Sequence, residues 1–249
     1  MSSKINSPSL PIPHRLPTNS PSFNTSSNSL RFKCRPHSVP SSSYTSPSRQ
    51  ESLDKVEHGS NVWDVRFETL EGCKLGISWY PDFEYNAKGG IGTAIGRKED
   101  EARNDDDTIS VTFDVGTLYI PPLTGATTKF LGLPLPPFLK IDIVPESFQG
   151  TISKESGKAD LQFRAKFWFS VGSIYKAPPL MVETTLTSEE STGKLRAGRG
   201  ERINGEGRCR LVGVALVNPI NDILMNSFLG LPSECIADLN ARISITSST

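Results

Sequence analysis

Apolar and polar residues alternate along most of the chain from residue 62 onward. In the longest run every second residue is apolar: Leu161, Phe163, Ala165, Phe167 and Phe169. Side chains along a strand point alternately to the two faces of a sheet, so this period of two predicts strands with one buried face. The same pattern occurs at 62–70, 73–79, 109–115, 139–144, 148–152, 181–186, 208–217 and 241–245, with the Gly-rich segment 85–96 as a further candidate. Short strands separated by Gly and Pro turns predict a mainly β fold, an antiparallel β-sandwich or barrel.

Local signals for a turn and a helix refine this picture. Glu71-Gly72 lies between two alternating segments and predicts a hairpin. Near the C-terminus, Asn218-Pro219 is typical of a helix start, and Gly230 followed by Pro232 is typical of a helix stop. Between them lies an apolar stripe at helical spacing: Ile220, Ile223, Leu224 and Phe228. We therefore predict a short helical segment near the C-terminus, and we also consider a second short helix over 233–240.

Two stretches of sequence occur twice. Phe113–Leu123 resembles Phe169–Leu180, and Phe130-Leu-Gly-Leu-Pro134 recurs letter for letter as Phe228-Leu-Gly-Leu-Pro232. One hypothesis is that the domain contains two related halves, with a hairpin inserted in the second. The alternative is that each pentapeptide is an efficient helix stop followed by a strand entry. The sequence leaves both interpretations open.

The first 50 residues differ in composition from the rest. They contain six Lys or Arg, no Asp or Glu, fifteen Ser and eight Pro. Such a segment buries too little apolar surface to fold, and an acid-free, Ser-rich, Arg-bearing leader is typical of an organellar transit peptide. Its prolines disfavour a long amphipathic helix, which favours the chloroplast over the mitochondrion. We expect a disordered chloroplast transit peptide over 1–50 and a single mainly-β domain over 51–249, with a charged loop at 97–107.

Hydropathy adds to the expected location. No apolar run in the sequence has the length of a secretory signal or of a transmembrane span. No second, apolar signal for transfer into the thylakoid lumen follows the leader. The expected location is therefore the chloroplast stroma or the stromal face of the thylakoid.

Charge and rare residues argue against several classes of function. The chain has 27 basic and 27 acidic residues; without the leader 21 and 27 remain, a net charge of −6, which disfavours general binding of nucleic acid. Beyond the leader the only histidine is His58, so neither a Ser-His-Asp triad nor a multi-His metal site is expected. Cys73, Cys209 and Cys235 lack C-x-x-C spacing, which argues against a disulfide framework or a zinc site. We predict no metal and no cofactor.

The segment Gly89–Gly96 superficially resembles the glycine turn with which short-chain dehydrogenases bind a dinucleotide. Such a turn must follow a buried strand and open a helix, because the helix N-terminus holds the pyrophosphate. Here Pro81–Lys88 precedes the glycines and a charged loop follows them. We therefore interpret the segment as a flexible strand or loop.

Two stretches are candidate binding surfaces. The most apolar non-periodic stretch is 130–139, with Phe130, Leu131, Leu133, Leu135 and Phe138. Its prolines exclude a central strand, so it either packs across an open end of the sheet or exposes a surface for a partner, a membrane or a ligand. A basic stretch contains Arg196, Arg199 and Arg202, which either contact an anionic group or cover a solvated hairpin tip.

These observations support one leading hypothesis and two alternatives. The leading one is a non-enzymatic plastid protein that binds an apolar or lipid-like ligand, a thylakoid membrane surface or a plastid protein partner through 130–139. The first alternative is an enzyme using carboxylate, Tyr or Lys chemistry in a barrel mouth. Tyr119 and Tyr175, at equivalent positions in the repeated stretch, are the residues to examine for it. The second alternative is a structural assembly factor or subunit.

Overall fold

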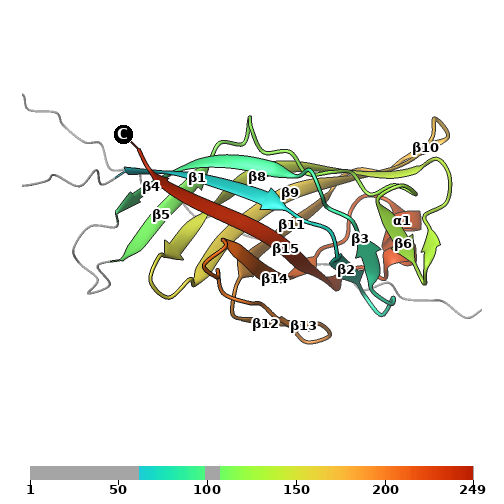
Figure 1. Ribbon diagram of the computed structural model, residues 1–249. Coiled ribbons are helices and arrows are strands. Elements are labelled where there is room, and N and C mark those ends of the chain that lie inside the picture. Colours follow the sequence, from blue (N-terminus) through green and yellow to red (C-terminus); the bar gives the residue numbers. More distant parts are fainter. Residues whose placement is uncertain (1–61, 99–106, 249) are drawn as a thin grey trace, which may run out of the picture. The chain divides into compact units, whose positions relative to one another are not determined.

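The computed structural model describes residues 62–98 and 107–248, so the predicted transit peptide over 1–50 and most of the predicted charged loop lie outside the described residues. Within these ranges the chain forms fifteen strands and one short helix, α1 (Ile223–Leu229) (Figure 1). The strands are β1 (Val62–Thr69), β2 (Cys73–Ile77), β3 (Phe83–Tyr85), β4 (Ile91–Lys98), β5 (Thr108–Phe113), β6 (Thr128–Phe130), β7 (Leu133–Pro134), β8 (Leu139–Ser153), β9 (Ala159–Val171), β10 (Tyr175–Lys176), β11 (Leu180–Thr187), β12 (Glu190–Thr192), β13 (Ala197–Arg199), β14 (Arg208–Val217) and β15 (Ser233–Ser247).

Eight of the strands form a closed antiparallel barrel. Their order around the ring is β1, β4, β5, β8, β9, β11, β14 and β15, which is also their order along the chain, and β1 pairs with β15 to close the ring. Each of these strands therefore has a backbone partner on both sides, but two of the pairings are short: β11 meets β14 only at Thr187 and Val212, and β5 meets β8 only over residues 108–112 and 149–153. The prediction of a mainly β, antiparallel fold with a short helical segment near the C-terminus is confirmed.

The predicted hairpin at Glu71-Gly72 is wrong. β1 and β2 both pair with the same edge of β15, β1 with residues 241–247 and β2 with residues 235–238. The chain bulges between them: Gly72 has a φ of 78°, and the side-chain amide of Asn240 donates to the carbonyl oxygens of Glu71 and Gly72, each at 3.2 Å. β15 offers both segments a continuous row of backbone partners, so they run on as one interrupted strand.

The helix begins later than predicted. Its N-cap is Asp222, whose carboxylate accepts the amide of Met225 at 2.9 Å, rather than the pair Asn218-Pro219. Its end agrees with the prediction, because Gly230 has left-handed backbone with a φ of 64°. The second helix considered over 233–240 is wrong. Those residues begin β15 and pair with β14 along their whole length, because a neighbouring strand overrides a weak local helix signal.

The repeated pentapeptide adopts two different structures. Phe130–Pro134 spans the end of β6, the turn and the whole of β7, whereas Phe228–Pro232 ends α1 and leads into β15. What the copies share is a left-handed glycine, with a φ of 79° at Gly132 and of 64° at Gly230. The relation between two halves of the domain stays a hypothesis.

An aromatic cluster lies in the interior of the barrel. The ring centroid of Phe148 lies 4.4 Å from that of Phe113, 5.2 Å from that of Phe67 and 5.8 Å from that of Phe163. Stacked and edge-to-face pairs such as these add to the stability that burial itself supplies. The four rings come from β1, β5, β8 and β9, so the cluster joins three consecutive strands of the ring to β1, which lies beyond β4.

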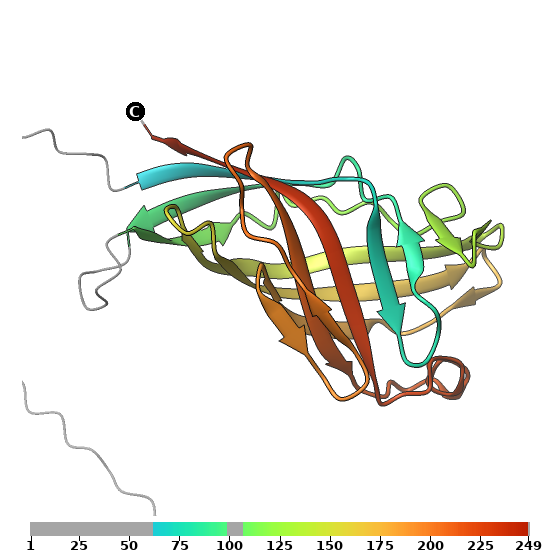
Figure 2. The same ribbon diagram turned by 60° about the horizontal axis from the view of Figure 1, so that its bottom comes forward.

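The two ends of the barrel differ. β1 begins and β15 ends at one of them. At the other lie the β2–β3 turn, the β6–β7 hairpin with the segment that follows it, the β9–β10 turn and α1 (Figure 2). We call this second end the loop end. There β2, β3, β6 and β7 pair in that order and extend the sheet beyond the ring.

Candidate functional site

Large apolar side chains gather on the loop end and point into solvent. Their exposed fractions range from 58% for Phe228 to 92% for Ile174. We call these eight residues the apolar tips: Trp79, Leu131, Leu133, Phe138, Ile174, Ile223, Leu224 and Phe228. Single exposed apolar residues are common, but a group on one end of a domain marks an interaction surface.

Aromatic contacts join three of the loops. The hydroxyl of Tyr80, in the β2–β3 turn, donates to the carbonyl oxygen of Phe228 in α1 at 2.7 Å. The ring of Tyr80 also lies 5.9 Å from the ring of Phe228 and 6.4 Å from that of Phe130 in β6. The β2–β3 turn, α1 and the β6–β7 hairpin are therefore held side by side.

Hydrogen bonds join the remaining loop to this group. The amide of Gly172, in the β9–β10 turn, donates to the carbonyl oxygen of Phe138 at 2.9 Å. The hydroxyl of Tyr175 donates to the carboxylate of Asp222 at 2.7 Å, and burial together with this bond raises the pKa of Tyr175 to about 12. All four loops thus form one connected surface, with the apolar tips projecting from it.

Two of the apolar tips have unusual backbone. Leu131 has a φ of 53° and Phe138 a φ of 71°, in the left-handed region that favours glycine. Large residues there cost about 1 kcal/mol or more each relative to glycine. Both side chains are also largely exposed, at 70% and 79%. Folding and solubility both disfavour these residue types at these positions, so a function for the exposed side chains is the better explanation.

Most of the apolar stripe that the sequence shows near α1 faces solvent, although such a stripe usually packs against the core. Ile223, Leu224 and Phe228 are exposed, whereas Met225 and Leu229 are buried against β11 and β14. Residues four apart lie on one face of a helix, so this seven-residue helix buries a narrow stripe. The other apolar residues protrude and become tips.

Arg196 braces the β2–β3 turn. Its guanidinium donates to the carbonyl oxygens of Ser78, at 3.0 Å, and of Tyr80, and it forms an ion pair with Asp82 at 2.7 Å. The guanidinium of Arg196 is thus bonded to groups of the protein itself rather than directed at a ligand. It fixes the backbone on both sides of Trp79, which orients that tip.

Glu234, near the start of β15, holds the hairpin that carries Arg196. Its carboxylate accepts the backbone amides of Lys194 and Leu195, both at 2.7 Å, and of Arg196 at 3.0 Å. These bonds lower the pKa of Glu234, and those from the amides of Lys194 and Leu195 have the largest effects. The resulting stabilisation is complete above the ordinary carboxyl pKa of 4.5 and is lost as the pH falls through the lowered value.

The loops that carry the tips contain few charged residues, and three lysines lie close to the tips in the flanking strands. In the loop segments 78–82, 130–138, 172–175 and 218–232 the charged residues are Asp82 and Asp222, both engaged in the contacts described above. Three exposed lysines, Lys129, Lys140 and Lys176, each lie two residues from a tip, namely Leu131, Phe138 and Ile174. We call them the lysine collar.

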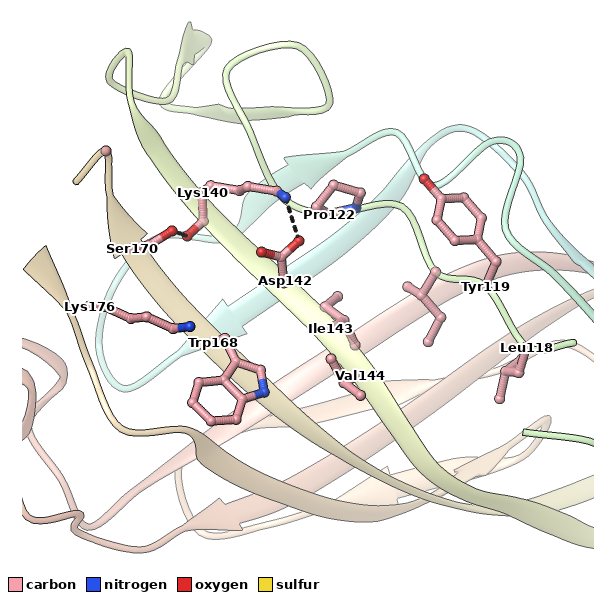
Figure 3. A pocket seen from close by; sticks show the side chains of 12 residues that line it. Leu118, Tyr119, Pro122, Lys140, Asp142, Ile143, Val144, Trp168, Ser170 and Lys176 are labelled. Carbon is pink, nitrogen blue, oxygen red and sulfur yellow. Dashed lines mark hydrogen bonds and ion pairs between the residues drawn. The ribbon is translucent and has the colours of Figure 1, made fainter. Parts of the chain in front are cut away.

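An open groove of about 690 Å³ adjoins the loop end on the outer face of β8 and β9 (Figure 3). One side is formed by the segment 118–122, which includes Tyr119. On the other side the ammonium of Lys140 pairs with Asp142 at 2.8 Å, and the ammonium of Lys176 lies 5.1 Å from the ring centroid of Trp168.

The structure divides the predicted surface 130–139 in two. Leu131, Leu133 and Phe138 are exposed, Leu135 is buried, and Phe130 is half-buried with its ring stacked on that of Phe83 at 4.7 Å. Part of the stretch therefore packs against the sheet and part of it is exposed, so each of the two interpretations holds for some of its residues. Two of its side chains anchor it to the sheet, and the other three project from it.

The remaining predicted site residues do not converge. Arg196 is bound to the β2–β3 turn, Arg202 pairs with Glu189 at 2.5 Å, and Arg199 is an exposed residue of β13. Tyr119 lines the groove, whereas Tyr175 lies against α1. The sequence did not predict a binding role for Trp79, for the apolar tips on α1 or for the lysine collar. The spacing of each lysine from an apolar loop residue is the signal that points to the collar.

Among the described residues the structure shows neither a reactive thiol nor a cluster of metal ligands. The three thiols are free, and burial raises the pKa of Cys73 and Cys235 to about 11 and that of Cys209 to about 12, which keeps them protonated. In residues 62–98 and 107–248 no group of three or more His, Cys, Asp or Glu is placed to hold a metal ion. Over the same residues no helix has the length and apolar character needed to cross a bilayer.

Comparison with known proteins adds no functional information to this geometry. The chain matches no protein-family model, no curated protein and no solved structure.

Proposed function

We propose that this protein is a non-enzymatic lipid-surface-binding protein that docks on a membrane through its apolar tips. The observation that carries the proposal is the set of eight exposed apolar side chains on four connected loops. Full burial of one such side chain contributes about 1.5–3 kcal/mol. Insertion of four of them therefore favours the membrane-bound state by roughly 6 kcal/mol or more before the cost of immobilisation.

The form of the loop end favours lipid over a protein partner. Its apolar groups stand on separate loop tips, and a fluid acyl layer accepts such projections without a matching surface. Several tip backbones are satisfied internally, as in the bond from the Ile174 amide to the Val171 carbonyl oxygen at 3.1 Å, which lowers the cost of entering an apolar layer. Trp79 and the lysine collar have the residue types that favour the interface between acyl chains and headgroups.

The proposed location is the plastid, at the stromal face of the thylakoid or in the stroma. Its support is the acid-free, Ser-rich composition of residues 1–50. A domain that binds a membrane from one side needs no spanning segment, so the proposed location and the proposed docking are compatible. A cytosolic distribution of the tagged full chain in leaf cells would contradict the location and leave the docking proposal intact.

Vesicle flotation tests the proposed function. The full chain is mixed with vesicles of phosphatidylcholine alone, or of phosphatidylcholine with anionic phosphatidylglycerol, and centrifuged through a density gradient. We expect it to float with both, and more with the anionic vesicles because of the lysine collar. A chain that stays in the dense fraction with both compositions contradicts the proposal and favours a protein partner for the loop end.

A further inference from the structure

The groove beside the loop end exists because the barrel wall opens there. β5 pairs with β8 only between residues 108–112 and 149–153. Closer to the loop end, the segment 118–122 is held by two isolated bridges, one from Tyr119 to Ile91 and one from the next residue after the segment, Leu123, to Ile141. Between these attachments β8 and the segment separate, and the space between them is the groove.

One part of the groove carries a positive charge. Lys140 is neutralised in part by Asp142, at 2.8 Å, but Lys176 has no carboxylate partner among the described residues. Its ammonium is positioned by Trp168, whose ring face attracts cations. The three charged side chains, two lysines and one aspartate, leave a net charge of +1. A cation held this way, at the surface and near apolar walls, is placed to receive an anion.

Apart from Ser170, the other side chains that line the groove are apolar or aromatic. Ile143 and Val144 of β8 line it together with Leu118 and Pro122 of the facing segment, and the ring of Tyr119 stands at its rim (Figure 3). A space that joins a cation to an apolar lining matches a molecule with both characters. A purely polar anion would leave the lining unused, and a purely apolar ligand would have to cover the ammonium.

The groove also continues toward the apolar tips. A second hollow of about 340 Å³ shares Lys140, Ser170 and Gly172 with it and reaches Phe138. The charged part therefore lies between two apolar regions, one of which ends at a tip.

We propose that this groove binds a single amphiphile whose anionic group pairs with Lys176 and Lys140 and whose apolar chain lies along Ile143 and Val144. The site is distinct from the apolar tips, and ligand binding in it does not require docking on a bilayer. The shared chemistry is a carboxylate, phosphate or sulfonate attached to an acyl chain. Two sources carry that chemistry: a free amphiphile, and an anionic lipid withdrawn from the membrane surface.

Titration with decanoate tests the site directly. In a full chain with Trp63→Phe and Trp79→Phe, Trp168 is the remaining tryptophan and reports on the groove. We expect saturable changes in its fluorescence at decanoate concentrations below those that form micelles, and binding of uncharged decanol that is about tenfold weaker or more. Thermal unfolding of each variant confirms that the fold is retained.

The matched variants are Lys176→Gln and Lys154→Gln. Lys154 also lies over an aromatic ring, 4.4 Å from the ring centroid of Trp63, and it is outside the groove. The substitution Trp63→Phe keeps an aromatic ring at that position in the reporter chain. Lys176→Gln should weaken decanoate binding about fivefold, since it removes one exposed charge contact, whereas Lys154→Gln should leave it unchanged. Equal binding of decanoate and decanol, or equal effects of the two substitutions, overturns the proposal.

Vesicles distinguish the two sources of the ligand. If decanoate fails to bind, but the extra binding to anionic vesicles is lost in Lys176→Gln and kept in Lys129→Gln, a collar lysine outside the groove, the ligand is an anionic lipid of the bilayer. If decanoate binds through Lys176, a free amphiphile suffices. Absence of both effects overturns the groove proposal, while flotation on neutral vesicles would still support docking by the tips.

Discussion

A full chain carrying Leu131→Asn together with Phe138→Asn should bind phosphatidylcholine vesicles about 100-fold more weakly than the wild type, because two inserting side chains of about 1.5–3 kcal/mol each are removed. The same chain should unfold at an equal or higher temperature. Asparagine tolerates left-handed backbone, and the wild-type φ values are 53° and 71°. The two effects have opposite signs, so loss of folding cannot account for loss of binding. Vesicle titration and calorimetry measure them.

Ile95→Thr is the matched control. Ile95 is exposed on β4, where it lies opposite Asp64 of β1, which in turn pairs with Thr246 near the end of β15. The loop end lies at Ser233, roughly 40 Å away at the usual rise of a strand. This substitution also removes an exposed apolar group but should leave vesicle affinity within about twofold. Equal losses in the control and the double variant would show that general hydrophobicity, rather than the loop end, drives binding.

Phe148→Ala should lower the free energy of unfolding by about 4 kcal/mol. Phe148 is 2% exposed and its ring contacts those of Phe67, Phe113 and Phe163, so truncation leaves a cavity between four strands of the ring. Denaturant unfolding followed by circular dichroism measures the change. A protein of typical stability would keep only a small margin after this loss.

Phe228→Ala provides the comparison for this second prediction. It makes the same truncation at a side chain that is 58% exposed, and should cost less than about 1 kcal/mol. If the two substitutions had similar effects, the interior would not depend on the aromatic cluster. Phe228→Ala should instead weaken vesicle binding, which Phe148→Ala should not do in any chain that remains folded.

Alternation was enough to predict the class of fold. The run from Leu161 to Phe169 lies within β9 and 208–217 coincides with β14, because both strands have one face in the core. Local signals failed where a distant strand supplied better partners. Glu71-Gly72 became a bulge and 233–240 became a strand, both through pairing that involves β15. β2 and β15 pair across more than 150 positions, and β14 and β15 across 16 to 34 positions, so neither pairing is contained in a local turn or helix signal.

The candidate site was less predictable for a physical reason. Apolar character marks Phe130, Leu131 and Leu135 alike, but the turn of the β6–β7 hairpin decides which of them faces solvent. The stripe of α1 was ambiguous in the same way, because seven residues contain apolar positions on more than one face. The groove depends on neighbouring strands, so it appears only once the barrel is assembled. The spacing of the collar lysines is visible in the sequence, but their gathering at one end of the barrel is not.

Quenching of Trp79 by lipid tests the central claim most directly. A full chain with Trp63→Phe and Trp168→Phe keeps Trp79 as its remaining tryptophan, at the loop end. On vesicles whose acyl chains carry bromine, the account predicts strong quenching and a blue shift of Trp79 emission, because this side chain enters the interface. Protein that binds such vesicles with Trp79 unquenched and its emission unshifted would contradict the account, since the membrane would then contact another face.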